Sequence, residues 1–253
     1  MSTKEPTPIL VHLPYSPWSQ KARWALDHHA LSYRSQTYLP MLGEPWLRAK
    51  TKRWSGRLTI PIWIEGEKVV MDSFDIARRA DELGERSPLF IAGREAAIDA
   101  WNTRSEAMLS AGRALTTDAV SRDAEALIEN VPAPMRRVRR VGEAVGRAGA
   151  RYLQKKYAFS PEQAAADRET LRAGCEALRN ALKKERYLFG TFSYADITMA
   201  MGLTFIEPPA RAPIGPKSRP HWRRDDLAET YRDLLDWRDG LLADHHPKWP
   251  AED

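Results

Sequence analysis

The chain has 253 residues, of which 43% are hydrophobic and 29% charged, and a formal net charge of +5. This composition is that of a globular protein with room for one large or two small domains, and so mild a positive charge does not indicate nucleic-acid binding. A single cysteine, a polar N-terminus without a secretory signal and the absence of a long apolar run predict a cytoplasmic protein that does not enter a membrane.

The first 86 residues alternate between strand-like and helical segments. Strands are predicted at Ile9–Leu13, Ser32–Tyr38, Ile62–Ile64 and Val69–Met71, and helices at Pro17–Ala30, Pro45–Lys50 and Ser73–Leu83. This order predicts one open sheet covered by helices. A right-handed crossover would make its first two strands parallel, and its last two would form a hairpin.

Beyond a linker at Glu85–Pro88, no strand pattern is found. Helices are predicted at Arg94–Thr117, Met135–Tyr157, Pro161–Lys184, Ser193–Phe205 and Leu227–Ala243. Five prolines between Glu207 and His221 exclude regular structure there, so we expect a long loop that covers a site or wraps a surface. The chain therefore divides into an α/β domain, residues 1–86, and an all-helical domain, residues 87–253, with a proline-rich insert near 207–221.

A serine stands at the turn between the first strand and the first helix, in Tyr15-Ser16-Pro17-Trp18-Ser19. Proline is favoured at the first helical position, so Ser16 is predicted to be the N-cap. Its hydroxyl would then lie among backbone N–H groups at the positive end of the helix dipole, which suits an anion such as a thiolate. Two interpretations are open: Ser16 only caps the helix, or it also holds an anionic ligand.

A proline precedes the third strand, in Thr59-Ile60-Pro61-Ile62. Proline cannot donate to a sheet ladder, so its place beside a strand needs a reason. A cis Ile60-Pro61 bond in a tight turn would leave the Ile60 backbone groups to pair with an extended ligand, as a strand does. A trans proline at the start of the strand is the alternative.

An acid and a serine, Asp72-Ser73, follow the hairpin and open a helix. Backbone N–H groups in a first helical turn have no intrahelical partner, so Ser73 can cap the helix or hold a ligand carboxylate. Asp72 offers a negative charge to a ligand ammonium group. Capping and ligand binding are both compatible with this pair.

The order of these three motifs resembles the thioredoxin-like domain of the cytosolic glutathione transferases, of a serine-type, bacterial-like kind. The helical remainder is similar too, because Ser193-Tyr194-Ala195-Asp196 resembles the capping box that begins a helix in that family. The resemblance covers roughly residues 9–205. It implies an α/β thioredoxin-like N-terminal domain followed by an all-α C-terminal domain.

The resemblance also implies a glutathione site. It makes Ser16 the catalytic residue, whose hydroxyl stabilises the glutathione thiolate. The backbone of Ile60, before cis Pro61, would pair with the glutathione cysteine. Asp72 and Ser73 would hold the ammonium and carboxylate groups of the γ-glutamyl end.

Other positions in the site are less defined by the resemblance. Thr59 stands where many members carry a lysine, so Arg57 or Lys52 is predicted to bind the glycyl carboxylate. Trp18 either walls the thiol pocket or packs in the core. Tyr15 and Ser19 are alternative donors to the thiolate.

The activity implied is that of a glutathione transferase, a homodimer active in detoxification, whose co-substrate glutathione attacks a small hydrophobic electrophile without a metal. Candidates to line the electrophile pocket are Trp101, Met108, Phe205 and Trp222, and each can equally be core. One alternative is a non-catalytic glutathione- or ligand-binding protein on the same fold. Another is a glutathione-dependent peroxidase, dehalogenase or etherase. Exchange chemistry by an enzyme thiol is not expected, because the sole cysteine, Cys175, lies far from Ser16 in sequence and is predicted to be buried.

One predicted helix, Met135–Tyr157, carries eight lysines or arginines and one glutamate. A solvated face is the main interpretation. A role in binding an anionic acceptor or a second subunit is the alternative. Aromatic residues are not interleaved there, so RNA or membrane binding is not expected. The histidine spacing gives no metal site.

Overall fold

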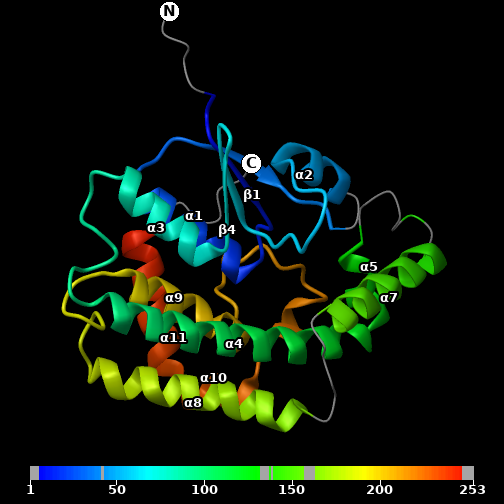
Figure 1. Cartoon of the computed structure of the whole chain (residues 1–253). Helices are drawn as coiled ribbons and strands as arrows, with labels where there is room; N and C mark the ends of the chain where they lie inside the picture. Colours follow the sequence, from blue (N-terminus) through cyan, green and yellow to red (C-terminus); the bar gives the residue numbers. More distant parts are fainter. Residues whose placement is uncertain (1–5, 41–42, 132–136, 138, 157–162, 247–253) are drawn as a thin grey trace, which may run out of the picture.

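The computed structural model of the chain describes residues 6–40, 43–131, 137, 139–156 and 163–246. An α/β part begins the chain and lies over a layer of long helices (Figure 1). Its elements are β1 (Ile9–His12), α1 (Pro17–His28), β2 (Arg34–Thr37), α2 (Glu44–Thr51), β3 (Ile62–Glu65), β4 (Lys68–Met71) and α3 (Ser73–Leu83). Every strand and helix predicted for this part is present, with ends shifted by two residues at most.

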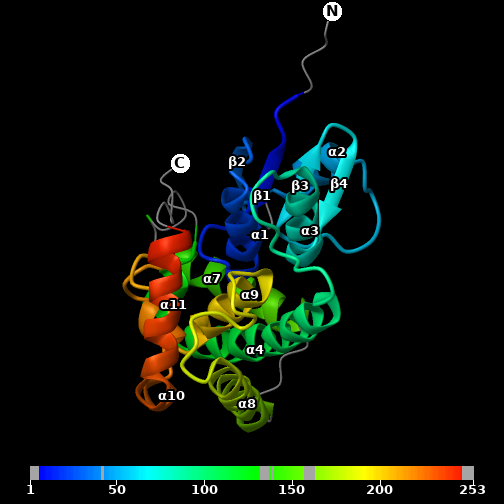
Figure 2. The ribbon, with the colours of Figure 1, turned by 90° about the vertical axis from the view of Figure 1, so that its left-hand side faces the viewer.

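The four strands form one sheet in the order β2-β1-β3-β4 (Figure 2). β1 runs parallel to β2 and antiparallel to β3, and β3 and β4 form the predicted hairpin. Side chains alternate between the two faces of a strand. Leu10 packs in the core with α1 and α3, whereas Ile9 and Val11 pack with Leu47 of α2. The sheet is thus covered by α1 and α3 on one face and by α2 on the other.

The rest of the described chain is helical, as predicted. Its elements are α4 (Glu95–Ser121), α5 (Ala124–Glu129), α7 (Arg139–Lys156), α8 (Ala164–Leu182), α9 (Tyr194–Gly202), η2 (Leu203–Phe205), η3 (Arg219–Trp222), α10 (Asp225–Thr230) and α11 (Arg232–His245). α9 is buried along its whole length and contacts α1 and α4, while α4 packs against α8 as well (Figure 1). α9 therefore joins the α/β part to the helical part.

Two predictions about the helical part need correction: the single helix after Leu227, and the lack of regular structure over Glu207–His221, where η3 begins at Arg219. The single helix expected over Leu227–Ala243 is two helices, α10 and α11, because the chain leaves helical geometry at the buried Tyr231. The hydroxyl of Tyr231 donates to Glu176 of α8 at 2.6 Å, which holds this corner in the core. Neither α5 nor η3 was predicted. The first residues expected for α7 and α8, Met135 and Pro161, lie outside the described residues.

The described arginines of α7 fit a solvated face. Arg139, Arg140 and Arg151 are exposed, and Arg147 forms an ion pair with Glu143 at 2.7 Å. None of the helices among the described residues is both long and apolar enough to cross a membrane.

Cys175 is fully buried in a core cluster with Leu171 and Leu178. Burial raises the pKa of its thiol to about 12, so the thiolate is strongly disfavoured at neutral pH. The prediction of a buried, structural cysteine is confirmed.

Candidate functional site

The register of the sheet brings the three sequence motifs to the same end of the molecule. Val11, near the end of β1, pairs with Ile62 at the start of β3, and Ile62 pairs with Met71 at the end of β4. The segments that adjoin these residues are therefore neighbours. They are the turn that ends in Ser16, the Ile60-Pro61 step before β3 and the Asp72-Ser73 step after β4.

Ser16 is the N-cap residue of α1, as predicted, with φ −79° and ψ 123°. Its backbone N–H donates to Leu13 at 3.0 Å, and its carbonyl accepts from Gln20 at 3.0 Å. Its side chain makes no capping hydrogen bond, although it is only 8% exposed. The hydroxyl thus lies at the positive end of α1 without serving as the cap, which leaves it available to a ligand.

The Ile60-Pro61 peptide bond is cis, which confirms the first of the two interpretations of this step. Pro61 is buried and Ile60 half-buried at the edge of the core under α2. The strand ladders begin one residue later, at Ile62, so the backbone of Ile60 lies outside the described strand pairing.

Asp72, not Ser73, is the N-cap of α3. Its side chain accepts from the backbone N–H of Phe74 at 2.8 Å, and its φ of +80° is one that residues other than glycine rarely adopt. Ser73 is the first helical residue and is 1% exposed, with its hydroxyl against that of the buried Tyr194. The expected capping role therefore belongs to the acid, whose side chain is exposed at the N-terminus of α3.

The two alternative donors beside Ser16 have different surroundings. Ser19 is fully buried and its hydroxyl accepts from the backbone N–H of Leu13 at 3.1 Å, so it is turned into the protein. Tyr15 is 37% exposed and its ring meets that of Trp222 edge-on, 6.3 Å between centroids. Of these two side chains, Tyr15 alone lies at the surface of the turn.

The residues predicted to bind the glycyl carboxylate lie between α2 and β3. Lys52 forms an ion pair with Glu67 of the hairpin at 2.9 Å, so its ammonium group is engaged there. Arg57 is exposed in the loop that leads to Ile60. Within the described residues, no three acidic, histidine or cysteine side chains gather closely enough to hold a metal ion.

Comparisons with known proteins identify a similar domain and a similar fold. Residues 15–83 match the family model of the glutathione S-transferase N-terminal domain. The α/β part of the chain is therefore similar to glutathione S-transferase N-terminal domains. A comparison with curated proteins gives no match.

Solved structures are similar to the chain over most of its length. A GST-like protein from Pseudomonas syringae has 19% identity and a TM-score of 0.58, with 94% of this chain and 66% of that protein covered. The beta-etherase LigF from Sphingobium has 20% identity and a TM-score of 0.61, with 94% of this chain and 96% of that protein covered. A glutathione transferase family member from Pseudomonas fluorescens was solved with bound glutathione. It has 13% identity and a TM-score of 0.60, with 93% of this chain and 94% of that protein covered. At such identities these likenesses show the glutathione transferase fold alone.

In this glutathione transferase fold, Lys21 is a site neighbour that sequence analysis missed. Its side chain is fully buried, and its ammonium group donates to Asn102 at 3.1 Å, to Thr198 at 3.2 Å and to Glu106. Glu106 of α4 also accepts from the indole N–H of Trp18 at 2.7 Å. Trp18 is thus fixed beside the Ser16 turn, half-buried, between the α/β part and α4. The sequence contains one indication that Lys21 is buried: it lies on the same helical face as the apolar Ala25.

The four electrophile-pocket candidates separate into two groups. Met108 is fully buried in the core, and Trp101 packs against the same core. Phe205 is buried as well, but its ring stacks on Trp222 at 4.7 Å, and Trp222 in turn meets Tyr15. Trp222 is therefore the candidate that the structure places next to the Ser16 turn.

The proline-rich segment holds Trp222 in this place. Glu129 of α5 accepts from the backbone N–H groups of Lys217 at 3.1 Å and Ser218 at 2.7 Å, and His221 contacts Asp123 at 2.8 Å. Arg219 binds carbonyl groups of the same segment, those of Pro208, Pro209, Ala210 and Ala212. The segment wraps the end of α4 and α5 and leads directly into η3.

Proposed function

We propose that the chain is a serine-type glutathione transferase in which Ser16 stabilises the glutathione thiolate. The observation that carries this proposal is the Ser16 hydroxyl. It caps nothing, lies at the N-terminus of α1, and adjoins the cis Ile60-Pro61 step and the N-terminus of α3. Two helix N-termini that meet at one place favour a bound anion.

Glutathione would extend across the end of the sheet. Asp72 would hold the ammonium group of its γ-glutamyl end. The backbone N–H groups in the first turn of α3, at Ser73, would hold the carboxylate of that end. The backbone of Ile60 would pair with the cysteine in the manner of a strand. Arg57 is our candidate for the glycyl carboxylate, because Lys52 is held by Glu67.

The chemistry follows from the state of the thiol. Free thiols are mostly protonated at neutral pH, and the thiolate is the nucleophile. A hydrogen bond donated by Ser16 to the sulfur lowers the thiol pKa, so the proton passes to solvent on binding. The thiolate then forms a carbon–sulfur bond to the electrophile, and the leaving group departs with the electron pair of the broken bond.

The acceptor is proposed as a small hydrophobic electrophile, held near Trp18 and Trp222. Ether cleavage is a second candidate, since the chain shares its fold with a beta-etherase. In either case we expect a cytoplasmic homodimer that acts in detoxification. A panel of an aryl halide, a β-aryl ether, an alkyl halide and a hydroperoxide, tested on one preparation, would identify the acceptor class.

The proposal is tested by Ser16→Ala with Tyr15→Phe as its matched control. Losing one positioned donor lowers turnover on the order of a hundredfold. Ser16→Ala should therefore do so and raise the pKa of bound glutathione, measured by thiolate absorbance, while glutathione still binds in calorimetry. Tyr15→Phe keeps the ring on Trp222 and should leave both quantities near wild type. If glutathione does not bind at millimolar concentration, or if Ser16→Ala turns over normally, the proposal is wrong. Binding without turnover for any acceptor would instead indicate a non-catalytic relative.

A further inference from the structure

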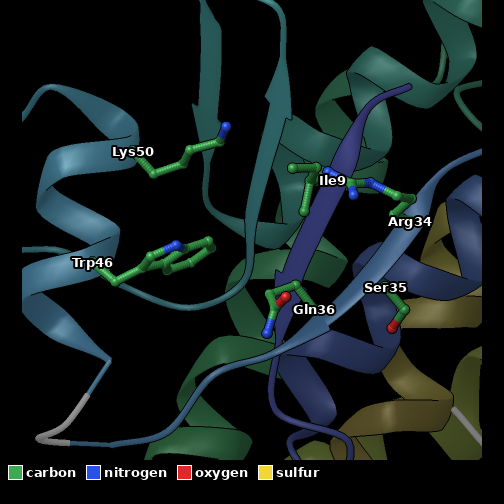
Figure 3. A pocket seen from close by; sticks show the side chains of 6 residues that line it. All are labelled: Ile9, Arg34, Ser35, Gln36, Trp46 and Lys50. Carbon is green, nitrogen blue, oxygen red and sulfur yellow. The ribbon is translucent and has the colours of Figure 1, made fainter. Parts of the chain in front are cut away.

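A cavity of about 250 Å³ lies between the sheet and α2 (Figure 3). Its lining residues come from three elements: Ile9, Arg34, Ser35, Gln36, Trp46 and Lys50. Ile9 begins β1, whereas the Ser16 turn follows the opposite end of that strand. The cavity is therefore separate from the proposed glutathione site.

The cavity exists because the edge strand is polar on the face that α2 covers. Arg34 is the ladder partner of Ile9, so Arg34 and Gln36 occupy the same face as the apolar residues Ile9 and Val11. Those residues make a core with Leu47, but β2 adds no apolar side chain to it. Space that a core would fill is left open beside β2.

Trp46 and Lys50 close the other side of the cavity. They stand four residues apart on α2, so they project from the same helical face. Figure 3 shows both side chains extending from α2 toward the strands. Trp46 is 44% exposed, which is unusual for so large an apolar side chain. Its ring offers a flat apolar surface to a molecule in the cavity.

The charge of the cavity is positive. In the described part of the chain, no carboxylate lies within ion-pair distance of Arg34 or Lys50. The acidic residue at the start of α2, Glu44, is held by Arg48 at 2.6 Å and does not offset them. Two cations thus line the same cavity as an exposed indole ring and the Gln36 amide.

We propose that this cavity is a binding site for a small planar aromatic anion. The ring of the ligand would lie against Trp46, and its carboxylate or sulfonate would lie between Arg34 and Lys50. Arginine and lysine both donate charge-assisted hydrogen bonds to such groups. The aromatic ring of the ligand can stack on the indole ring of Trp46. A cavity of about 250 Å³ is below the usual size of a drug-binding pocket, which suits a molecule of one or two rings.

Calorimetry with 2-naphthalenesulfonate as the probe tests the proposal, with 2-naphthol and methanesulfonate as matched molecules that lack the charge or the ring. The probe should bind at one site, at least tenfold more tightly than either control molecule. Saturating glutathione should not displace it. Exposed ion pairs contribute up to about 1 kcal/mol, so Arg34→Gln and Lys50→Gln should each weaken binding up to about fivefold. Trp46→Leu should weaken it as well.

The control variant is Lys68→Gln, which removes an exposed cation from the opposite edge strand and should leave the affinity unchanged. Perturbation of the Trp46 indole N–H signal by the probe, assigned with Trp46→Phe, would locate the ligand. Three results would overturn the proposal: no binding at millimolar probe, unchanged binding in the Arg34→Gln/Lys50→Gln double variant, or competition by glutathione. None of them bears on Ser16, so failure here is distinct from failure of the proposed transferase activity.

Discussion

The buried ammonium group of Lys21 donates to the carboxylate of Glu106, which accepts from Trp18 as well. Lys21 is fully buried, whereas the side chain of Glu106 is 36% exposed. Burial lowers the pKa of Lys21, and the negative charges of Glu106 and Asp72 raise it again. One carboxylate of α4 thus compensates a buried charge on α1 and fixes the ring that adjoins Ser16.

Removing that carboxylate should destabilise the protein. Glu106→Gln leaves the Lys21 charge buried among neutral oxygens, and breaking a fully buried pair costs several kcal/mol. Because Glu106 is partly solvated, we expect a loss of about 2 kcal/mol in the free energy of unfolding, measured with urea. The double variant Lys21→Met/Glu106→Gln removes the buried charge itself and should recover much of the loss. Equal stability of the single and double variants would contradict this account.

Asp72 should contribute to glutathione binding through its charge more than through its cap. Asp72→Asn keeps an oxygen for the Phe74 N–H and the shape of the side chain at φ +80°, so stability should change little. Loss of the charge should weaken glutathione binding several-fold in calorimetry. Asp72→Ala, which removes cap and charge, should lose about 1 kcal/mol of stability in addition. If Asp72→Asn binds glutathione with wild-type affinity, the ammonium group of glutathione does not lie beside Asp72.

Arg57 can be tested with a modified glutathione. If its guanidinium binds the glycyl carboxylate, Arg57→Gln should raise the KM for glutathione several-fold. The glycyl ethyl ester of glutathione lacks that charge, so wild type and variant should use it with the same KM. Lys52→Gln, whose lysine is paired with Glu67, serves as the control. A variant effect of equal size on the ester would assign Arg57 to another contact.

The sequence predicted the α/β part well because its signals are local. The strand patterns, the Pro17 helix start and the hairpin before Ser73 each depend on a few neighbouring residues. The register of three short strands then brings Ser16, Ile60-Pro61 and Asp72 together. The division after residue 86 stays a prediction.

Long-range contacts account for what sequence analysis missed. Lys21 and Glu106 are 85 positions apart, and a lysine on a helix is ordinarily solvated, so nothing in the local pattern selects its partner. Tyr231 breaks a continuous helical periodicity because α8 holds its hydroxyl, a cause that no window around residue 231 contains. The cavity beside β2 likewise depends on which face of the sheet α2 covers.

The C-terminal histidines should make the fold sensitive to acid. His246 is 3% exposed and stacks on Trp24 at 5.3 Å, with Asp27, Arg23 and Arg211 around it, and burial lowers its pKa from 6.5 to about 3. Between these values the unfolded chain binds the proton and the folded chain does not. Stability therefore rises with pH over this window and is lost on acidification, by about 1.4 kcal/mol per pH unit for this group. His246→Phe keeps the stack and should flatten the slope of unfolding free energy against pH. If the slope is unchanged in His246→Phe, groups other than His246 cause the acid sensitivity.

A glycine under Phe205 should control the acceptor site without touching glutathione. A Cβ on Gly112 of α4 would clash with the Cβ of Phe205. The ring of Phe205 stacks on that of Trp222. Gly112→Ala must therefore displace Phe205 and Trp222, at a cost of about 1–3 kcal/mol in stability. We expect the KM for the acceptor to rise several-fold and the glutathione affinity to stay near wild type. Gly240→Ala, where a Cβ meets open space on α11, should leave both unchanged. A fall in glutathione affinity as large as the rise in acceptor KM would show that Trp222 does not belong to the acceptor side alone.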